Sequence, residues 1–441
     1  MSEQVITVGA AGADFCGADN RAIQAAIDEI ARGGGGTVQV LPGAYLLEDS
    51  VHLRDHVRLV GAGAETVLRK APERYSRLAA YVGYGHYDVS VADPDRFAVG
   101  MGVTIRDDNA VGFYETIATL TWRDGDRFGI GHMLNHDYAP RHGGELYTSF
   151  PPVSARFIAN VEVRDLVIDG NRGENPHTLN GCRGAGMYLL AVSQAVVANV
   201  AVRDLNGDAI GFQQCRDLRL EDCVLENNAG HGLHPGSGSL QGAMRRCRCV
   251  GNGGDGIFFC LRATYCICES CKFVGNRGHG VSIGERDTHN AIVGCGIEGN
   301  GDAGVHFRDT DEVMAPHATL VAGNDLADNC REQGEAEISV QGAVGDVHVL
   351  ENVIRRQAGA RPVAGVRVAS AVVGAQVWGN RCQGDFTAPT QVEPGAKVGF
   401  TRPERELPVG PDAAPADADR HLPPQVRGGA PCRPAQPNGS C

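Results

Sequence analysis

Large aromatic side chains and long apolar runs are scarce in this chain of 441 residues. Phe, Trp and Tyr make up 6% of the residues, so few large rings are available to fill a core. No run of about eighteen apolar residues occurs, which argues against a membrane-spanning helix, and we expect no membrane partner. Lys and Arg number 40 against 53 for Asp and Glu, a formal charge of −13, and this acidic balance argues against a nucleic-acid partner.

The N-terminal segment lacks a basic region followed by an apolar stretch, so we expect no secretory signal. The 15 cysteines are too sparse for a disulfide scaffold. We therefore predict reduced thiols and a cytoplasmic location. The cysteines allow two other interpretations: a zinc site at Cys266, Cys268 and Cys271, and a disulfide between Cys432 and Cys441. No second cysteine pair stands at zinc-finger spacing, so no metal ligand is predicted.

Glycine is abundant, at 60 residues, and the chain repeats with a period of 24. A fixed period of this length is typical of solenoids. An apolar residue follows Gly or Ala in each repeat, and a second often stands two positions on, as in a short strand. The key apolar positions are Met187, Ile210, Leu233, Ile257, Val281 and Val305.

Two polar ladders accompany these strands. One consists of Asn228, Asn252, Asn276 and Asn300, and the other of Asn160, Asn199, Cys223, Cys247, Cys271, Cys295, Asn324, Asn352 and Asn380. Inward Asn side chains can bond to the neighbouring coil, and a buried column of Cys acts as a stack of small apolar groups. The sequence therefore predicts an all-β protein, a parallel β-helix of coils of about 24 residues.

The N-terminal segment predicts a helix capped by Asp19 and running to about Ala31, followed by GGGG and an alternating strand. This segment, ITVGAAGADFCGADNRAIQAAIDEIARGGGGTVQVLPGAYLL, resembles the N-terminal module of the pectate-lyase superfamily. The resemblance implies a right-handed β-helix closed by a capping helix. Four regions are expected: the cap and first coils (1–70), an aromatic-rich insertion (71–156), the β-helix coils (157–400) and a disordered tail rich in Pro and Ala (401–441).

A column of titratable residues stands two positions before the key apolar residue of successive coils: Asp208, His231, Asp255 and His279. Such residues are also common turn formers, so a structural role is the alternative. Four of them in register favour acid–base chemistry. We expect Asp255 to face solvent, flanked by His234, Arg262, Glu285, Arg308 and Asp309.

The stretch GHGVSIG at 278–284 resembles a motif of polygalacturonases, glycoside hydrolase family 28. In that family the preceding coil carries Gly-Asp-Asp-Cys, of which GGDGIFF keeps one acid, Asp255. The coil before it carries an acid where AGHGL has His231. The next coil carries an Arg-Ile-Lys stretch that grips the uronate, where GVHFRD offers His306 and Arg308. Two of the family's three acids are thus replaced, which implies a relative with rearranged acid–base groups.

The leading functional hypothesis is a glycoside hydrolase acting on a carbohydrate chain. Asp255 is its expected general acid, Glu285 or Asp309 its second carboxylate, and His231 and His279 the residues that tune them. The residues expected to bind substrate are His234, Arg262, His306 and Arg308.

Two alternatives stay open. A lyase or epimerase acting on uronic-acid sugars would use Arg or His as the base, with Ca²⁺ at Asp287, Asp309 and Asp311 as its implied cofactor; the hydrolase needs no cofactor. The second alternative is a non-catalytic β-helix that serves binding or assembly as a homotrimer.

Overall fold

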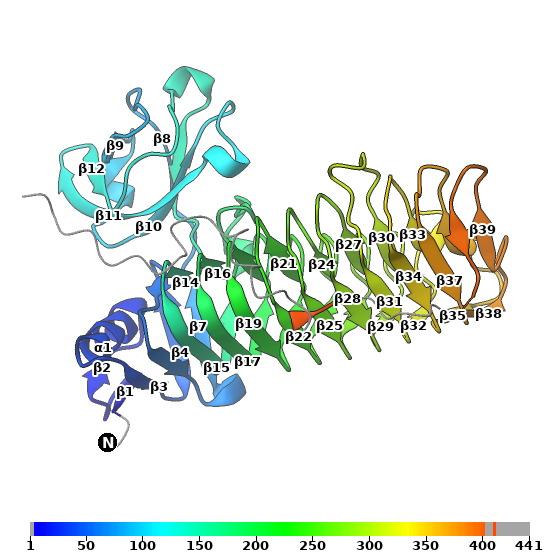
Figure 1. Ribbon diagram of the computed structural model, residues 1–441. Helices are drawn as coiled ribbons and strands as arrows, with labels where there is room; N and C mark the ends of the chain where they lie inside the picture. The colour runs from blue at the N-terminus through cyan, green and yellow to red at the C-terminus, as the bar shows by residue number, and fades with distance from the viewer. Residues whose placement is uncertain (1–3, 402–408, 412–441) are drawn as a thin grey trace, which may run out of the picture.

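Short parallel strands stacked along one axis make up most of the chain (Figure 1). The computed structural model describes residues 4–401 and 409–411. In successive coils, corresponding strands pair in parallel, as Leu233 with Ile257 and Val281 with Val305 show. These key apolar residues are fully buried, so the period of 24 is the length of one coil. The predicted parallel β-helix is confirmed.

One face of the solenoid is an eleven-stranded parallel sheet. Its strands are β5 (Val51–His52), β14 (Val153–Arg156), β16 (Met187–Leu190), β18 (Ile210–Gln213), β21 (Leu233–Gly236), β24 (Ile257–Phe258), β27 (Val281–Ile283), β30 (Val305–Phe307), β33 (Ala336–Val340), β36 (Ala364–Val368) and β39 (Thr390–Val392).

The other faces form a 23-stranded sheet in two columns. The long strands β15 and β17 belong to both columns, because β17 pairs first with β19 and then with β20. The strands are β1 (Val5–Gly9), β2 (Phe15–Cys16), β3 (Gly36–Val40), β4 (Gly43–Leu47), β6 (Val57–Val60), β7 (Thr66–Lys70), β15 (Ala159–Asp169), β17 (Ser193–Arg203), β19 (Arg216–Glu221), β20 (Val224–Glu226), β22 (Ala243–Arg245), β23 (Arg248–Val250), β25 (Ile267–Glu269), β26 (Lys272–Val274), β28 (Ala291–Val293), β29 (Gly296–Glu298), β31 (Leu320–Ala322), β32 (Asp325–Ala327), β34 (Val347–Leu350), β35 (Val353–Arg356), β37 (Ala375–Trp378), β38 (Arg381–Gly384) and β40 (Val398–Gly399).

The helix α1 (Asn20–Arg32) lies against the first coils. Asp19 caps it, since its carboxylate accepts hydrogen bonds from the backbone N–H groups of Arg21 and Ala22. Its apolar face is buried, and the glycines that follow turn the chain into β3. A side chain on Gly35, which has φ +108°, would collide with the backbone of His56. The predicted helix is confirmed, and it does not reach the length and hydropathy that a membrane-spanning helix requires.

Buried amides join consecutive coils along the predicted Asn228 ladder. Each Nδ2 donates to the Oδ1 of the next Asn at 2.7–3.0 Å, through Asn228, Asn252, Asn276, Asn300 and Asn329. A second ladder joins Asn324, Asn352 and Asn380 in the same way. The column of Cys223, Cys247, Cys271 and Cys295 is buried, and these thiols form no disulfide.

The prediction was wrong for the first two members of the mixed ladder. Asn160 and Asn199 are exposed and have φ of 55° and 52°. They occupy left-handed turns that Asn tolerates well. The next residue, Val200, pairs with Leu166 of β15 and lies in the core. The apparent ladder position is therefore displaced by one residue in these coils.

Residues 75–147 form an antiparallel six-stranded sheet, which lies within the predicted insertion. It stands beside the first coils, next to β14 and β16 (Figure 1). Its strands are β8 (Tyr75–Arg77), β9 (Asp88–Ser90), β10 (Gly102–Arg106), β11 (Thr116–Asp124), β12 (Arg127–Ile130) and β13 (Glu145–Tyr147). The described part of the chain also has five short 3₁₀ turns, η1 (Gly63–Glu65), η2 (Pro94–Arg96), η3 (Gly112–Tyr114), η4 (Pro140–His142) and η5 (Arg172–Glu174).

This insertion has a core of its own, which includes Tyr138, whereas Tyr81, Tyr84, Tyr87, Tyr114 and Trp122 are exposed. Most of the predicted tail, 402–408 and 412–441, lies outside the described residues.

Candidate functional site

The predicted column of Asp208, His231, Asp255 and His279 is assembled, and it links the coils. Asp208 Oδ1 accepts from the His231 N–H at 2.7 Å, His231 Nδ1 from the Asp255 N–H at 2.8 Å, and Asp255 Oδ1 from the His279 N–H at 2.6 Å. Asp255 is 7% exposed, so the expectation that it faces solvent was wrong. Since Nδ1 of His231 accepts a hydrogen bond, the proton of its neutral ring lies on Nε2.

Phe258 connects the column to the outer face of the eleven-stranded sheet. Its ring stacks on His231 with centroids 4.6 Å apart and meets the edge of His234 at 5.4 Å. The guanidinium of Arg308 lies over the same Phe258 ring, 4.5 Å from its centroid. Sequence reasoning missed Phe258, although it follows a key apolar residue by one position, as His234 and His306 do.

Arg308 spans two coils below that ring. Its Nη1 donates to Ser282 Oγ at 3.0 Å, and its Nη2 donates to the carbonyls of Phe259 and Cys260 at 2.8 and 3.0 Å. The carboxylate of Asp287 lies 3.5 Å from Nη2. These contacts hold the guanidinium of Arg308 in one place while leaving its side chain 19% exposed.

His279 and His306 form a second pair of rings on neighbouring coils. Their centroids are 4.2 Å apart and their planes differ by 9°. Burial, together with the nearby His279 and Arg308, lowers the pKa of His306 to about 3, so that its ring is neutral. Nε2 of His279 lies 3.7 Å from the carboxylate of Asp302, a residue that the sequence reasoning did not single out.

His234 was expected to bind substrate, but it is 4% exposed. A loop covers it, since a side chain on Gly181 would come within 2.7 Å of Nδ1. Nδ1 lies 2.6 Å from Asp208 Oδ2. Burial alone would lower the pKa of His234, but the hydrogen bond to Asp208 and the nearby Cys260 raise it to about 10.

The remaining predicted site residues stand apart. Arg262 and Asp309 are exposed and Glu285 is half-buried. Arg262 and Glu285 are joined through the backbone, by an N–H to carbonyl bond of 3.0 Å. Both have positive φ, at 59° and 48°, as in turns beyond the strands. Within the described residues, no hydrogen bond or ion pair ties these three side chains to the column.

The three aspartates considered for Ca²⁺ are not gathered into one cluster. Asp287 is fully buried and accepts hydrogen bonds from the N–H groups of Ala263 and Gly284. Burial raises the pKa of Asp287, against the effect of Arg308. Asp309 and Asp311 are exposed, and Asp311 accepts from the Met314 N–H.

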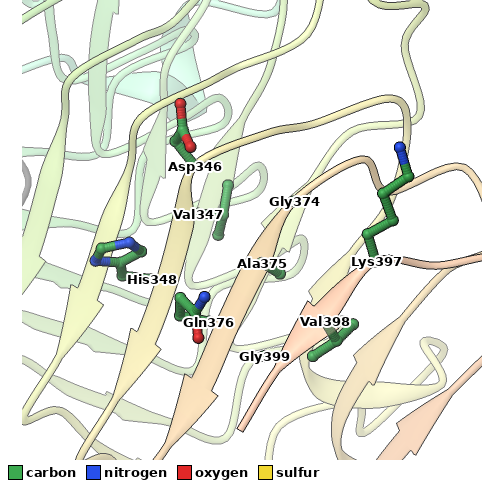
Figure 2. A pocket seen from close by; sticks show the side chains of 9 residues that line it. All are labelled: Asp346, Val347, His348, Gly374, Ala375, Gln376, Lys397, Val398 and Gly399. Atoms are coloured by element: carbon green, nitrogen blue, oxygen red, sulfur yellow. The ribbon is translucent and has the colours of Figure 1, made fainter. Parts of the chain in front are cut away.

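A separate hollow of about 320 Å³ lies at the far end of the solenoid. Figure 2 shows its lining between β34, β37 and β40, with Asp346, His348, Gln376 and Lys397 among its side chains. Burial lowers the pKa of His348. These strands belong to the 23-stranded sheet, so the hollow is distinct from the column.

The chain matches the family model described as "Right handed beta helix region" over residues 145–265 and 177–326. No curated protein matches it. Among solved structures, it is similar to the A-module of mannuronan C-5 epimerase AlgE4 from Azotobacter vinelandii, with 16% identity and a TM-score of 0.55 over 87% of this chain and 96% of that one. A polygalacturonase from Erwinia carotovora ssp. carotovora is also similar, with 12% identity and a TM-score of 0.53 over 90% and 97%.

ORF18 of Geobacillus virus E2 is similar as well, with 14% identity and a TM-score of 0.50, but the alignment covers only 63% of that chain against 91% of this one. The chain is a right-handed parallel β-helix protein, as its N-terminal segment led us to expect. At these identities the neighbours show the fold alone. The resemblance to the polygalacturonase motif stays a prediction.

Proposed function

We propose that this protein is a carbohydrate-active enzyme that acts on a polysaccharide containing uronic acids, by removing the proton next to the sugar carboxylate. The observation that carries the proposal is the division of charge on the eleven-stranded sheet. The side chains of His231, His279 and Arg308 are 25%, 18% and 19% exposed, whereas Asp208, Asp255 and Asp287 are buried and hydrogen-bonded. Such a face suits an anionic substrate better than a pair of free carboxylates would.

In the proposed reaction, His279 takes the proton at Nε2, and Asp302 stabilises the imidazolium that forms. The electron pair of the broken C–H bond moves into the substrate carboxylate, where Arg308 offsets the growing charge. A solvent water molecule supplies the proton to the leaving oxygen or to the other face of the intermediate, and His279 returns its proton to the hydroxide that remains. The intermediate then either expels the glycosidic oxygen of the neighbouring carbon, as in a lyase, or regains a proton on its other face, as in an epimerase.

Incubation in D₂O with a panel of polysaccharides tests the proposal. Uronic-acid polymers such as polymannuronate and polygalacturonate should either acquire deuterium next to the carboxylate or yield an unsaturated product that absorbs in the ultraviolet. A neutral glucan should do neither. His279→Gln should reduce the rate by about 10²–10⁴-fold, the usual contribution of a general base. His289→Gln, which changes a ring stacked on Tyr265, is the matched control and should keep the wild-type rate.

The glycoside hydrolase expected from the sequence is the second candidate. It is favoured by the position of Asp255 between His231 and His279, where the polygalacturonase motif has an acid. New reducing ends with neither deuterium nor an unsaturated product would identify hydrolysis. In that case Asp255→Asn should lower kcat at least about a hundredfold, since it removes the proton to be donated.

The non-catalytic alternative predicts binding of a polysaccharide without any product. The homotrimer that accompanies it is checked by light scattering of the purified chain. The predictions of a carbohydrate partner, no nucleic-acid partner and a cytoplasmic location stand as expectations from the sequence.

A further inference from the structure

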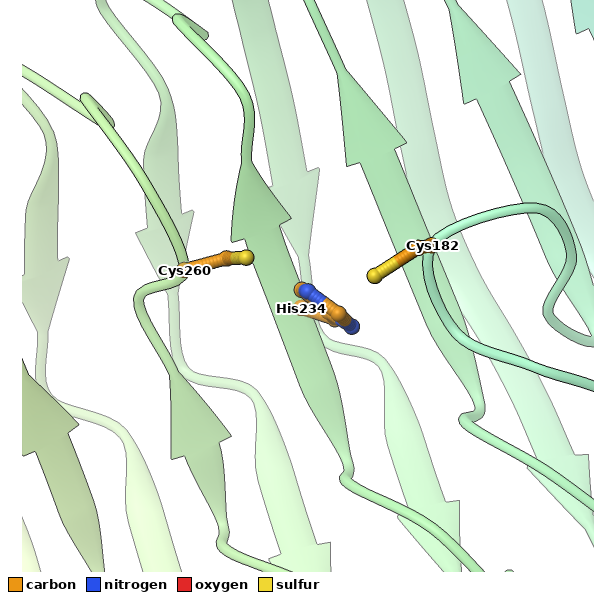
Figure 3. A group of neighbouring side chains, drawn as sticks. All are labelled: Cys182, His234 and Cys260. Atoms are coloured by element: carbon orange, nitrogen blue, oxygen red, sulfur yellow. The ribbon is translucent and has the colours of Figure 1, made fainter. Parts of the chain in front are cut away.

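Two cysteines flank the buried His234 from opposite sides (Figure 3). Cys182 lies in the loop before β16, His234 in β21, and Cys260 just after β24. One ligand atom from each of the three residues lies within 4.8 Å of those of the other two. Residues far apart in sequence thus present two sulfur atoms and one nitrogen atom to a common point.

Polar atoms at this point lack partners. Nε2 of His234 is buried and makes no hydrogen bond of normal geometry with the described residues, whereas Nδ1 is engaged by Asp208. The carboxamide of Gln213 is equally buried and unpaired at both its oxygen and its nitrogen. It lies beside Cys260, because a side chain on Gly236 would meet Cys260 Cβ at 2.8 Å and both Gln213 atoms at 3.0 Å. Unpaired buried polar groups are costly, so their gathering points to a missing ligand.

The loop that carries Cys182 is fixed from both sides. Tyr188 donates its hydroxyl to the Cys182 carbonyl at 3.0 Å, and Asn180 Oδ1 accepts from the Cys182 N–H at 2.9 Å. Next to it, Arg183 hydrogen-bonds to the carbonyl of Phe113 in the insertion and lies 5.9 Å from the centroid of that ring. These contacts fix the backbone of Cys182 in the loop before β16.

We propose that Cys182, His234 and Cys260 bind one Zn²⁺ ion through two thiolates and Nε2 of the imidazole. Zinc bonds of about 2.0–2.3 Å in a tetrahedron place the ligand atoms roughly 3.5–3.8 Å apart, so only small side-chain movements are needed. The hydrogen bond from His234 Nδ1 to Asp208 orients the ring as carboxylates do for zinc-bound histidines. On binding, the two thiol protons pass to solvent, together with the Nε2 proton of the imidazolium form of His234.

Sulfur and imidazole ligands favour Zn²⁺ over Ca²⁺ or Mg²⁺, which prefer oxygen. Three protein ligands leave a fourth position for water or another small ligand. The unpaired amide of Gln213, which lies beside Cys260, is close enough to be a neighbour of that fourth ligand. This site uses none of the cysteines at 266, 268 and 271, which are buried in the core. It goes beyond the proposed function, does not rest on it, and departs from the expectation that the chain binds no metal.

The test is zinc binding by the full chain, stripped of metal with a chelator under reducing conditions. We expect one Zn²⁺ per chain in competition with a chromophoric chelator. Cys182→Ser and Cys260→Ser should each weaken the affinity at least about a hundredfold, because even the loss of a residue that only supports a ligand costs about 10–100-fold. Cys16→Ser, which removes an exposed thiol outside the cluster, is the matched control and should bind as the wild type does.

Cobalt gives a second measurement that needs no variant. Co²⁺ bound to the wild type should show thiolate-to-metal charge-transfer absorption, which Zn²⁺ then removes. Absence of that band, zinc binding unchanged in the Cys182→Ser/Cys260→Ser double variant, or a disulfide between these two cysteines in the native protein despite added reductant would each overturn the proposal.

Discussion

Asn276 sits in the middle of the Asn ladder, and its replacement by Ala should destabilise the solenoid strongly. Its Nδ2 donates to the Cys249 carbonyl at 3.1 Å and to Asn300 Oδ1 at 3.0 Å. Its Oδ1 accepts from the backbone N–H and from Nδ2 of Asn252, at 3.1 and 2.9 Å. Four buried hydrogen bonds at about 0.5–1.5 kcal/mol each amount to about 2–6 kcal/mol of unfolding free energy.

Urea denaturation followed by circular dichroism measures this loss as a shift of the midpoint. Arg277→Ala changes the next residue, which is exposed, and should stay within about 0.5 kcal/mol of the wild type. If Asn276→Ala costs less than about 1 kcal/mol while the control behaves as expected, the ladder does not stabilise the coils in the way described. A broadened transition would show that the coils on either side of Asn276 unfold separately.

Three further outcomes are expected. The pKa of His306 is about 3 in the folded chain, below the ordinary value of about 6.5. Between these two pH values the unfolded chain binds one more proton than the folded chain, so the free energy of unfolding falls as the pH drops. His306→Gln should therefore flatten the fall in melting temperature between about pH 7 and about pH 5, and an unchanged slope would contradict the assignment. Thiol labelling of the native protein should be fast at the exposed Cys16 and slow at the buried Cys247 until unfolding, and equal rates would refute the buried column. If the insertion contacts substrate, Tyr84→Ala, at a ring that is 63% exposed, should raise KM more than it lowers kcat; no change in either would assign that ring another role.

The period of 24 predicted the solenoid because equal spacing is a local property of the sequence. The capping helix was predictable for the same reason, since the cap at Asp19 and the apolar face of α1 lie within one short segment. The position of Asn199 was misjudged because a shift of one residue along a strand turns an inward-facing side chain outward.

Burial within the site was not predictable from spacing. His234 has the same offset in its coil as His306, yet it is sealed by Gly181, a residue of a long loop anchored on the insertion at Phe113. Phe258 was missed because an apolar residue at an outward position has no chemical signal of its own. Its role appears only when His231 and Arg308 are found on its ring.

Along the Asn ladder, coil length can change without loss of registration. From Asn300 to Asn329 the step is 29 residues instead of 24, yet the amide contact is kept at 2.7 Å. On the eleven-stranded sheet, Val305 still pairs with Ile338, 33 positions later. The added residues therefore lie in the turns between strands, within 309–319 and 330–335. These turns are natural points for grafting foreign peptides, because their length is uncoupled from the repeat that holds the rod together.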